Sequence, residues 1–362
     1  MNEPGPASTG SDPVRRDAGE VAREAGVPRE AVELARSCEV VDLHLESFIP
    51  PRLWGYDLLA HHHPPPLGGR YFGHLDVPRA LEGGLTGAMW SIATNVARSA
   101  SVRPALLERN LLALRETLER SGRVVAVRTP AEYRAARAEG KHAALLAVQG
   151  GNALEGAEAR VGTIADGLIT RVTVVHLTSS VYGDTSSPLR LRADRGLTAA
   201  GRGMVRALNE ARVFVDLAHV SPRGFWDAVA VHDRSQPLIV THTGASAVHR
   251  MWRNLEDDQI RAVADTGGVV AVIFHHGFLG SRVRDGRPVI DHLEAVIRAG
   301  GEDAAALGSD FDGAIVPPPD LRDGATAYYR LVSYMLERGW REERIRRVLG
   351  ASFLASWDRL RP

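Results

Sequence analysis

Short apolar runs of strand length alternate along this chain with longer segments of helical period. The runs lie near residues 38–44, 86–92, 143–149, 170–176, 212–218, 237–242, 268–274 and 304–309. Many are continuously apolar, which is typical of strands buried on both faces of a parallel sheet. Eight such units favour a (β/α)8 barrel over an open doubly wound sheet. The sequence also allows seven or nine strands.

The segments between these runs carry helical periodicity and helix end signals. Residues 104–122 place leucines in one broad stripe and end at a glycine, as amphipathic helices often do. Further helices are expected over 130–140, 198–211 and 221–233, the last with Ser221 as its N-cap. Another is expected to begin at Asn254, because acidic residues follow in its first turn.

The chain is expected to form a single barrel domain over residues 16–362, since 362 residues do not require a second core. Residues 1–15 are rich in Pro, Gly, Ser and charge, and we expect them to be disordered. Residues 48–76 are aromatic and proline-rich, and are expected to form a βα loop over the barrel mouth. The three histidines at 61–63 are interpreted as solvated, because three prolines follow and leave poor chelating geometry.

Composition argues against several classes of protein. Lys plus Arg and Asp plus Glu both number 44, and this zero formal net charge gives no sign of a nucleic-acid partner. No apolar window approaches about 18 residues, and no apolar stretch follows the N-terminal arginines, so we expect a cytoplasmic protein without membrane contact. The single cysteine, Cys38, excludes an internal disulfide and is interpreted as a small buried hydrophobe. A homodimer is the default expectation.

Polar residues of hydrolytic chemistry recur where the apolar runs end. The ends carry His44 with Glu46, Gln149, His176, His219, His242 and Asp310. Because the carboxyl ends of barrel strands meet at one mouth, these side chains are expected to converge on one site. Imidazole and carboxylate are the ligands of hydrolytic metal centres.

Each of these ends suggests a role. His44 and Glu46 are two residues apart in a strand, so both can reach one ion, although a polar strand exit is an equally good interpretation. His219 and His242 occupy corresponding positions on successive strands and are expected to lie side by side. Asp310 has the position of a residue that accepts a proton from an activated water.

The remaining polar residues are less informative. His176 is interpreted either as a donor to a substrate oxygen that gains charge or as a packed core histidine. Asp312 is expected to form a turn before Gly313. A structural role is favoured for the histidines not yet discussed, which are His74, His142, His232, His249, His275, His276 and His292. For His275 and His276, which end the seventh run, the alternative is that one of them lines the pocket.

A series of segments, in order and at similar spacing, carries a resemblance to a known family. The segments are VVDLHLES, LLAVQGGNAL, VTVVHLTSS, VFVDLAHVS, LIVTHTGASAV, RNLEDDQI and LGSDFDG. DLAHVS and GSDFDG are the most specific, together with the step Arg253-Asn254 after His242. From about residue 38 to about residue 358, the chain resembles the membrane (renal) dipeptidase family of metallopeptidases, which are amidohydrolase-type barrels.

The resemblance implies a two-zinc barrel that hydrolyses dipeptides. It implies metal-binding positions, including one for a bridging glutamate, at His44, Glu46, Gln149, His219 and His242. It also implies that His176 contacts the substrate, that Arg253 holds a substrate carboxylate, and that Asp310 shuttles a proton.

Two residues depart from the family pattern. Glu46 stands where the family usually has Asp, which keeps the charge and lengthens the side chain by one methylene. Gln149 replaces the bridging glutamate, so that a stretch resembling EGGHS reads QGGNA here. An amide offers one neutral oxygen where a carboxylate offers two anionic ones, so two cations would be poorly neutralised. We therefore expect one zinc, or weak occupancy, rather than a tight pair, with another divalent metal as an alternative.

Three functions are compatible with these residues. The leading prediction is a metal-dependent hydrolase of the dipeptidase type that cleaves a dipeptide or small amide, because a single zinc can still lower the pKa of a water to about 7. The second is a ligand-binding pseudoenzyme, for which Gln149 is the chief reason. The third is another mononuclear amidohydrolase reaction, such as deamination or cyclic-amide opening, since fold does not fix chemistry.

Overall fold

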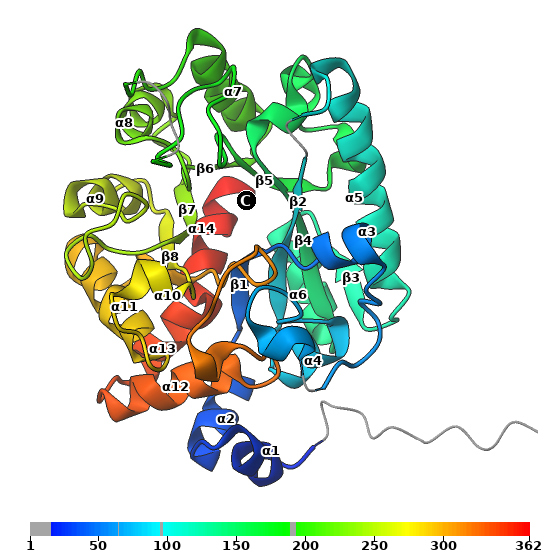
Figure 1. The fold of residues 1–362 in the computed structure, drawn as a ribbon, viewed down its shortest axis with the longest axis vertical. Helices are drawn as coiled ribbons and strands as arrows, with labels where there is room; N and C mark the ends of the chain where they lie inside the picture. The colour runs from blue at the N-terminus through cyan, green and yellow to red at the C-terminus, as the bar shows by residue number, and fades with distance from the viewer. Residues whose placement is uncertain (1–15, 64, 95–96, 189–192) are drawn as a thin grey trace, which may run out of the picture.

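The chain folds into a closed parallel barrel surrounded by helices (Figure 1). The computed structural model describes residues 16–63, 65–94, 97–188 and 193–362, so the expected disorder of residues 1–15 lies outside the described part. The strands are β1 Val41–Leu45, β2 Gly87–Ala93, β3 Val124–Ala126, β4 His142–Gln149, β5 Ile169–Thr173, β6 Phe214–Asp216, β7 Leu238–Thr243, β8 Val269–Val272 and β9 Ala305–Leu307.

Parallel pairing closes the strands into a ring. The order is β2-β1-β9-β8-β7-β6-β5-β4-β3, and β2 also pairs with β4 from Gly87 opposite Ala143 to Ala93 opposite Gln149. With β3 outside the ring, eight of the nine strands form the barrel, and the predicted (β/α)8 architecture is confirmed. Several strands are shorter than predicted: the run 212–218 contains a strand of only three residues, β6.

The strand β3 was not predicted. Among the described strands it pairs only with the start of β4, from Val124 opposite His142 to Ala126 opposite Ala144. The end of β4 pairs with β5 instead. A three-residue strand, of which only the first residue is fully buried, is too short to produce a recognisable apolar run.

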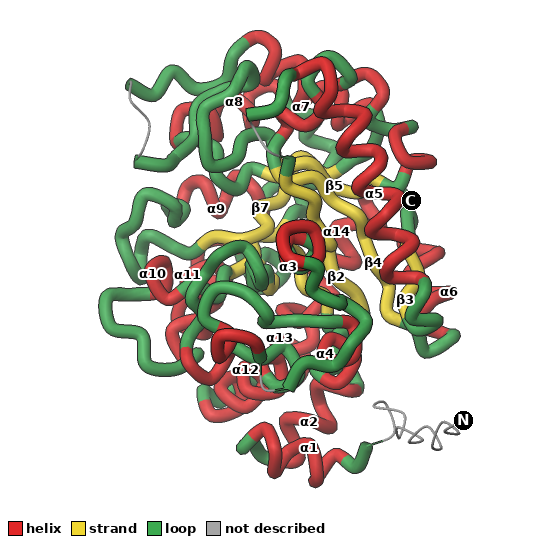
Figure 2. The backbone as a smooth tube through the Cα atoms, turned by 45° about the vertical axis from the view of Figure 1, so that its right-hand side comes forward, coloured by secondary structure: helices red, strands yellow, loops and turns green. Residues whose placement is uncertain are grey.

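Helices pack around the ring and at its two ends (Figures 1 and 2). They are α1 Ala18–Ala25, α2 Arg29–Arg36, α3 Ile49–Trp54, α4 Val77–Glu82, α5 Arg103–Glu119, α6 Pro130–Ala138, α7 Ala199–Glu210, α8 Pro222–Val231, α9 Asp257–Ala264, α10 His276–Leu279, α11 Arg287–Gly300, α12 Ala327–Glu337, α13 Glu342–Arg346 and α14 Ser352–Leu360. Within the described ranges, no helix combines the length and apolar character needed to span a bilayer.

Of the two helix N-caps that were predicted, the structure confirms one. Ser221 caps α8 as predicted, because its hydroxyl accepts from the backbone N–H of Gly224 at 3.1 Å. The predicted N-cap Asn254 is wrong: α9 begins at Asp257 behind a capping box of Glu256 and Gln259. The Asn254 amide instead donates to the carbonyls of His249 and of Phe278 in α10, at 2.8 and 2.9 Å. Competition from these tertiary hydrogen bonds explains the shift.

Helix α14 closes the end of the barrel at which the strands begin. Inward-facing strand residues, among them Leu43, Leu145 and Phe214, form one apolar cluster with Phe353 and Trp357 of α14. The chain end lies at the amino-terminal rim, because the Arg361 guanidinium donates to the carbonyl of Ile169, the first residue of β5, at 3.1 Å. Since α14 packs against this end, the carboxyl ends of the strands are left for a site.

The segment 48–76 is tied to the barrel by Asp312. This carboxylate is fully buried and accepts from the backbone N–H of His74 at 3.0 Å and from the Ser47 hydroxyl. Asp312 does lie in the expected turn before Gly313, with a φ of 66°, but its carboxylate bonds partners that lie far away in the sequence. The histidines at 61 and 63 are exposed, as expected of a solvated stretch. Cys38 is buried, as predicted.

Candidate active site

The carboxyl ends of the strands position the predicted site residues. His44 and His242 lie within β1 and β7, and Gln149 is the last residue of β4. Alternation along β4 places Gln149 on the same face as Leu145, an inner-core residue, so its amide lies directly above that core. Three other predicted residues, His176, His219 and Asp310, lie just beyond the ends of β5, β6 and β9.

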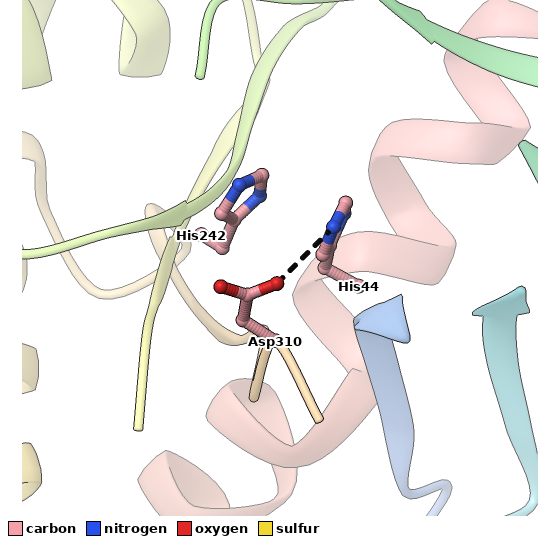
Figure 3. Close-up of side chains that lie close together, drawn as sticks. All are labelled: His44, His242 and Asp310. Atoms are coloured by element: carbon pink, nitrogen blue, oxygen red, sulfur yellow. Dashed lines mark ion pairs between the residues drawn. The ribbon is translucent and has the colours of Figure 1, made fainter. Parts of the chain in front are cut away.

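One group of ligand atoms surrounds Nε2 of His44. This atom lies 3.4 Å from Oε1 of Glu46 and 3.5 Å from Oδ1 of Asp310. Ligand atoms of His44, His242 and Asp310 all lie within 4.8 Å of one another (Figure 3). Two ligands held at about 2.1 Å by a tetrahedral ion are roughly 3.4 Å apart, so the His44 group has suitable spacing.

Unpaired polar atoms point to the same place. Within the described part of the chain, Nε2 of His44 and both carboxylate oxygens of Glu46 are buried without a hydrogen-bond partner. Burying such atoms unpaired is costly, and a divalent cation would satisfy all three. The residues of this group therefore fit a metal ion.

The other half of the site is arranged differently. Nε2 of His219 lies 2.8 Å from Nε2 of His242, so the predicted pair does lie side by side. The amide nitrogen of Gln149 faces both rings, at 3.2 and 3.4 Å. The carbonyl oxygen of Gln149 accepts from Arg171 at 3.3 Å and lies 2.8 Å from the hydroxyl oxygen of Thr173. This oxygen is thus turned away from the histidines, and Gln149 presents a donor where the family pattern has a metal ligand.

Arg171 is a residue of the site that was not predicted. Its side chain is fully buried inside the barrel, and its guanidinium contacts Nδ1 of His44 at 2.8 Å and the Ser91 hydroxyl at 2.6 Å. It forms an ion pair with Asp216 at 3.4 Å. The sequence does carry a signal for it, because a charged residue interrupts the apolar run ITRVTVV with Thr173 on the same face.

Two further predicted residues line the site. Arg253 is buried, and its Nε and Nη2 have no hydrogen-bond partner within the described residues. The ring of His176 lies edge-on to that of His219, with 4.7 Å between the ring centroids. A guanidinium with free donors beside an imidazole can hold a carboxylate and a neighbouring carbonyl.

A pocket opens beside His176. Its volume is about 340 Å³, and its apolar wall contains Ile49 and Leu53 of α3 with Ala93 and Leu177. Leu53 and Leu177 are 68% and 54% exposed, so this wall is open to a ligand. The first part of the segment 48–76 thus lies at the mouth of the barrel.

Residues 29–360 match the membrane dipeptidase family, peptidase family M19. The chain belongs to this family. A solved dipeptidase described as a metallopeptidase of family M19 is 27% identical, with a TM-score of 0.77 over 89% of this chain and 98% of that one. A metallopeptidase from Rhodobacter sphaeroides, bound to a phosphinate mimic of the dipeptide L-Ala-D-Ala, is also 27% identical, with a TM-score of 0.76 over 89% and 99% of the two chains.

A third relative resembles only part of this chain. An uncharacterized protein encoded in the pqqA 5' region of Klebsiella pneumoniae is 36% identical over 167 residues, which is 44% of this chain and 59% of that protein. The family and the two solved metallopeptidases support a metal-dependent hydrolase of the dipeptidase type, as predicted.

The histidines of the site are in the neutral form that can bind a metal ion. Burial lowers the pKa of His44, His219 and His242 well below the usual histidine value, so all three rings are neutral near pH 7. Burial, with the nearby Asp310, raises the pKa of Glu46 well above its usual range. Burial likewise raises the pKa of Asp310 to about 8. A divalent cation reverses this effect by favouring the ionised carboxylates.

His219 and Asp310 share an unusual backbone conformation. Their φ angles are 64° and 63°, in the left-handed region that non-glycine residues rarely adopt. In this conformation the chain turns sharply just after β6 and β9. Both side chains reach the site from these turns.

Proposed function

We propose that this M19 family member is a dipeptidase that works with one divalent ion, of the zinc class, held by His44, Glu46 and Asp310. The observation that carries the proposal is the convergence of buried, unpaired ligand atoms on Nε2 of His44 at 3.4 and 3.5 Å. When bound, such an ion polarises the scissile carbonyl and makes water a stronger nucleophile.

Arg253 orients the substrate. Its two unpaired nitrogens receive the C-terminal carboxylate of a dipeptide in a bidentate contact. Burial lowers the pKa of Arg253 to about 10, which keeps the guanidinium charged at neutral pH. A substrate without a free carboxylate would leave this buried charge unpaired.

His176 and Asp310 act at the scissile amide. Burial and the nearby Arg253 lower the pKa of His176 to about 3, so the ring is neutral and can donate one N–H to the carbonyl oxygen as negative charge develops. Asp310 accepts a proton from the attacking water and passes it to the leaving amine. The apolar pocket beside His176 receives the side chain of the N-terminal residue.

A substrate panel tests the proposal. The purified protein, supplied with zinc or manganese, is incubated with L,L and L,D dipeptides, and released amino acids are quantified. We expect cleavage by the wild-type protein and none by Glu46→Gln. Failure of the metal-loaded protein to cleave any member of the panel would overturn the proposal. Calorimetric binding without cleavage would then identify a ligand-binding protein.

A further inference from the structure

We infer that Arg171 is a resident cation of the metal centre, which competes with a metal ion for His44 and holds Gln149 with its amide nitrogen toward His219 and His242. The inference rests on the proposed one-ion site and deepens it. It assigns the weak metal affinity that we expect of that site to a positioning residue on the wall of the barrel.

The contact with His44 sets the tautomer of its ring. Nη2 of Arg171 lies 2.8 Å from Nδ1 of His44. A guanidinium only donates hydrogen bonds, so Nδ1 accepts and the neutral ring carries its proton on Nε2. That proton lies on the atom that faces Glu46 and Asp310.

This arrangement is the reverse of an ordinary metal ligand. A histidine that binds a metal usually donates its second ring N–H to a carboxylate or carbonyl. Here the second nitrogen of His44 meets a donor, so an ion can use Nε2 only when the Arg171 contact is broken. Arg171 therefore lowers the affinity of the His44 group for any divalent ion.

The second contact acts on the other half of the site. Nη1 of Arg171 donates to the carbonyl oxygen of Gln149 at 3.3 Å and to the Thr173 hydroxyl at 2.6 Å. Because the oxygen is held on this side, the amide nitrogen of Gln149 lies against His219 and His242. The hydrogens of that nitrogen therefore face the two Nε2 atoms, which an ion would need as ligands.

The charge of Arg171 is directed at the site. Among the described residues, the carboxylate within ion-pair distance of Arg171 is that of Asp216, at 3.4 Å. Asp216 is also satisfied without Arg171. It accepts from the hydroxyls of Thr173 and Thr241 at 2.6 and 2.8 Å, and from the backbone N–H groups of Ala218 and Thr241 at 3.0 and 3.1 Å.

These partners of Asp216 make a variant practical. Arg171→Met keeps most of the side-chain volume and removes the charge. It leaves Asp216 with its other hydrogen-bond partners. Arg171→Lys keeps the charge. Ser91→Ala removes another hydrogen-bond partner of Arg171 without changing any charge, and serves as the matched control for packing.

Metal binding in the absence of substrate tests the inference. Cobalt is titrated into each metal-free protein, the visible absorption is followed, and ions per chain are counted by elemental analysis. We expect Arg171→Met to bind cobalt at least tenfold more tightly than wild type, with Arg171→Lys and Ser91→Ala close to wild type. Unchanged or weaker binding by folded Arg171→Met would overturn the inference.

A double variant tests the second contact. We expect Gln149→Glu alone to bind one ion, because the new carboxylate pairs with Arg171, and Arg171→Met with Gln149→Glu to bind two. Two ions in Gln149→Glu alone would contradict the role of Arg171. If Arg171→Met does not fold, Arg171→Gln replaces it, with the same expected gain.

A spectroscopic readout separates this role from a purely structural one. In the metal-free wild type, histidine nitrogen chemical shifts should show His44 protonated on Nε2, and the tautomer should change in Arg171→Met. An unchanged tautomer would refute the inference. None of these measurements requires dipeptide cleavage, so failure of the proposed reaction would not be mistaken for failure of the role of Arg171.

Discussion

The side-chain nitrogen of Gln149 lies 3.2 Å from Nε2 of His219, and its carbonyl oxygen faces the opposite way. A glutamate at this position would offer an oxygen in either orientation, whereas the amide has one face that donates and one that accepts. The substitution therefore does more than remove a negative charge. It places a hydrogen-bond donor against Nε2 of both His219 and His242, the atoms through which these rings would bind an ion.

The two halves of the site should respond differently to loss of a ligand. We expect Glu46→Gln to weaken zinc binding by at least about tenfold, because it removes a carboxylate ligand of the ion. His219→Ala should have a much smaller effect, since the Gln149 amide already occupies that half. Competition with a chelating dye measures both affinities. A greater loss in His219→Ala would show that the ion binds beside His219 rather than beside His44, against our proposal.

Arg253 should control recognition of the substrate carboxylate. Replacement by Met removes charged hydrogen bonds worth about 1.5–3 kcal/mol, which corresponds to a fall of roughly 10- to 100-fold in kcat/KM. Most of the change should be in KM, because the contact exists before the reaction begins. A dipeptide whose C-terminus is amidated is the control substrate and should lose little. Equal losses for both substrates would argue against this role.

The apolar pocket should select the N-terminal side chain. Burying a leucine side chain is worth about 1.5–3 kcal/mol, so we expect Leu-Ala to be cleaved with roughly tenfold higher kcat/KM than Gly-Ala. Leu53→Asp should reduce that ratio. The matched control is Val102→Asp, which alters an exposed apolar residue that does not line the pocket. A ratio unchanged by Leu53→Asp would remove α3 from substrate recognition.

Stability at acid pH should depend on His142, far from the metal centre. Nε2 of His142 accepts from the Trp90 indole N–H at 3.1 Å, and Nδ1 lies 3.0 Å from the carbonyl of Leu85, so the ring is required to be neutral. Burial lowers the pKa of His142 from 6.5 to about 4. The unfolded chain therefore binds more protons between these values, and stability falls as the pH drops through this window.

The expected size of this effect is about 3 kcal/mol between pH 6.5 and pH 4. Urea unfolding of wild type and His142→Gln across that range measures it. The variant should show a shallower dependence of the unfolding free energy on pH, by up to about one proton. Parallel curves for the two proteins would show that His142 does not contribute.

Much of the architecture could be predicted because the ring strands are buried on both faces. Continuous apolar runs then mark each strand, and the polar residue that ends a run marks the barrel mouth, as at His242. The strand β3 gave no such signal, because it has three residues and pairs only at the start of β4.

Side-chain partners were harder to predict than elements. Arg171 lies in an apolar run, and its contacts with His44 and Gln149 join strands that are distant in the sequence. The same is true of Asp312, whose partners Ser47 and His74 are more than two hundred residues away. Local turn chemistry predicted the turn at Asp312, but it could not predict the tertiary hydrogen bonds of its carboxylate.

The left-handed backbone at His219 and Asp310 has a consequence for how this site could change over generations of mutation. Each such residue costs roughly 1 kcal/mol relative to glycine, so folding stability alone would favour glycine at both positions. We expect His219→Gly and Asp310→Gly to raise the melting temperature while metal binding or turnover is lost. A library of variants selected only for thermal stability would then be enriched in stable proteins that have lost the catalytic site.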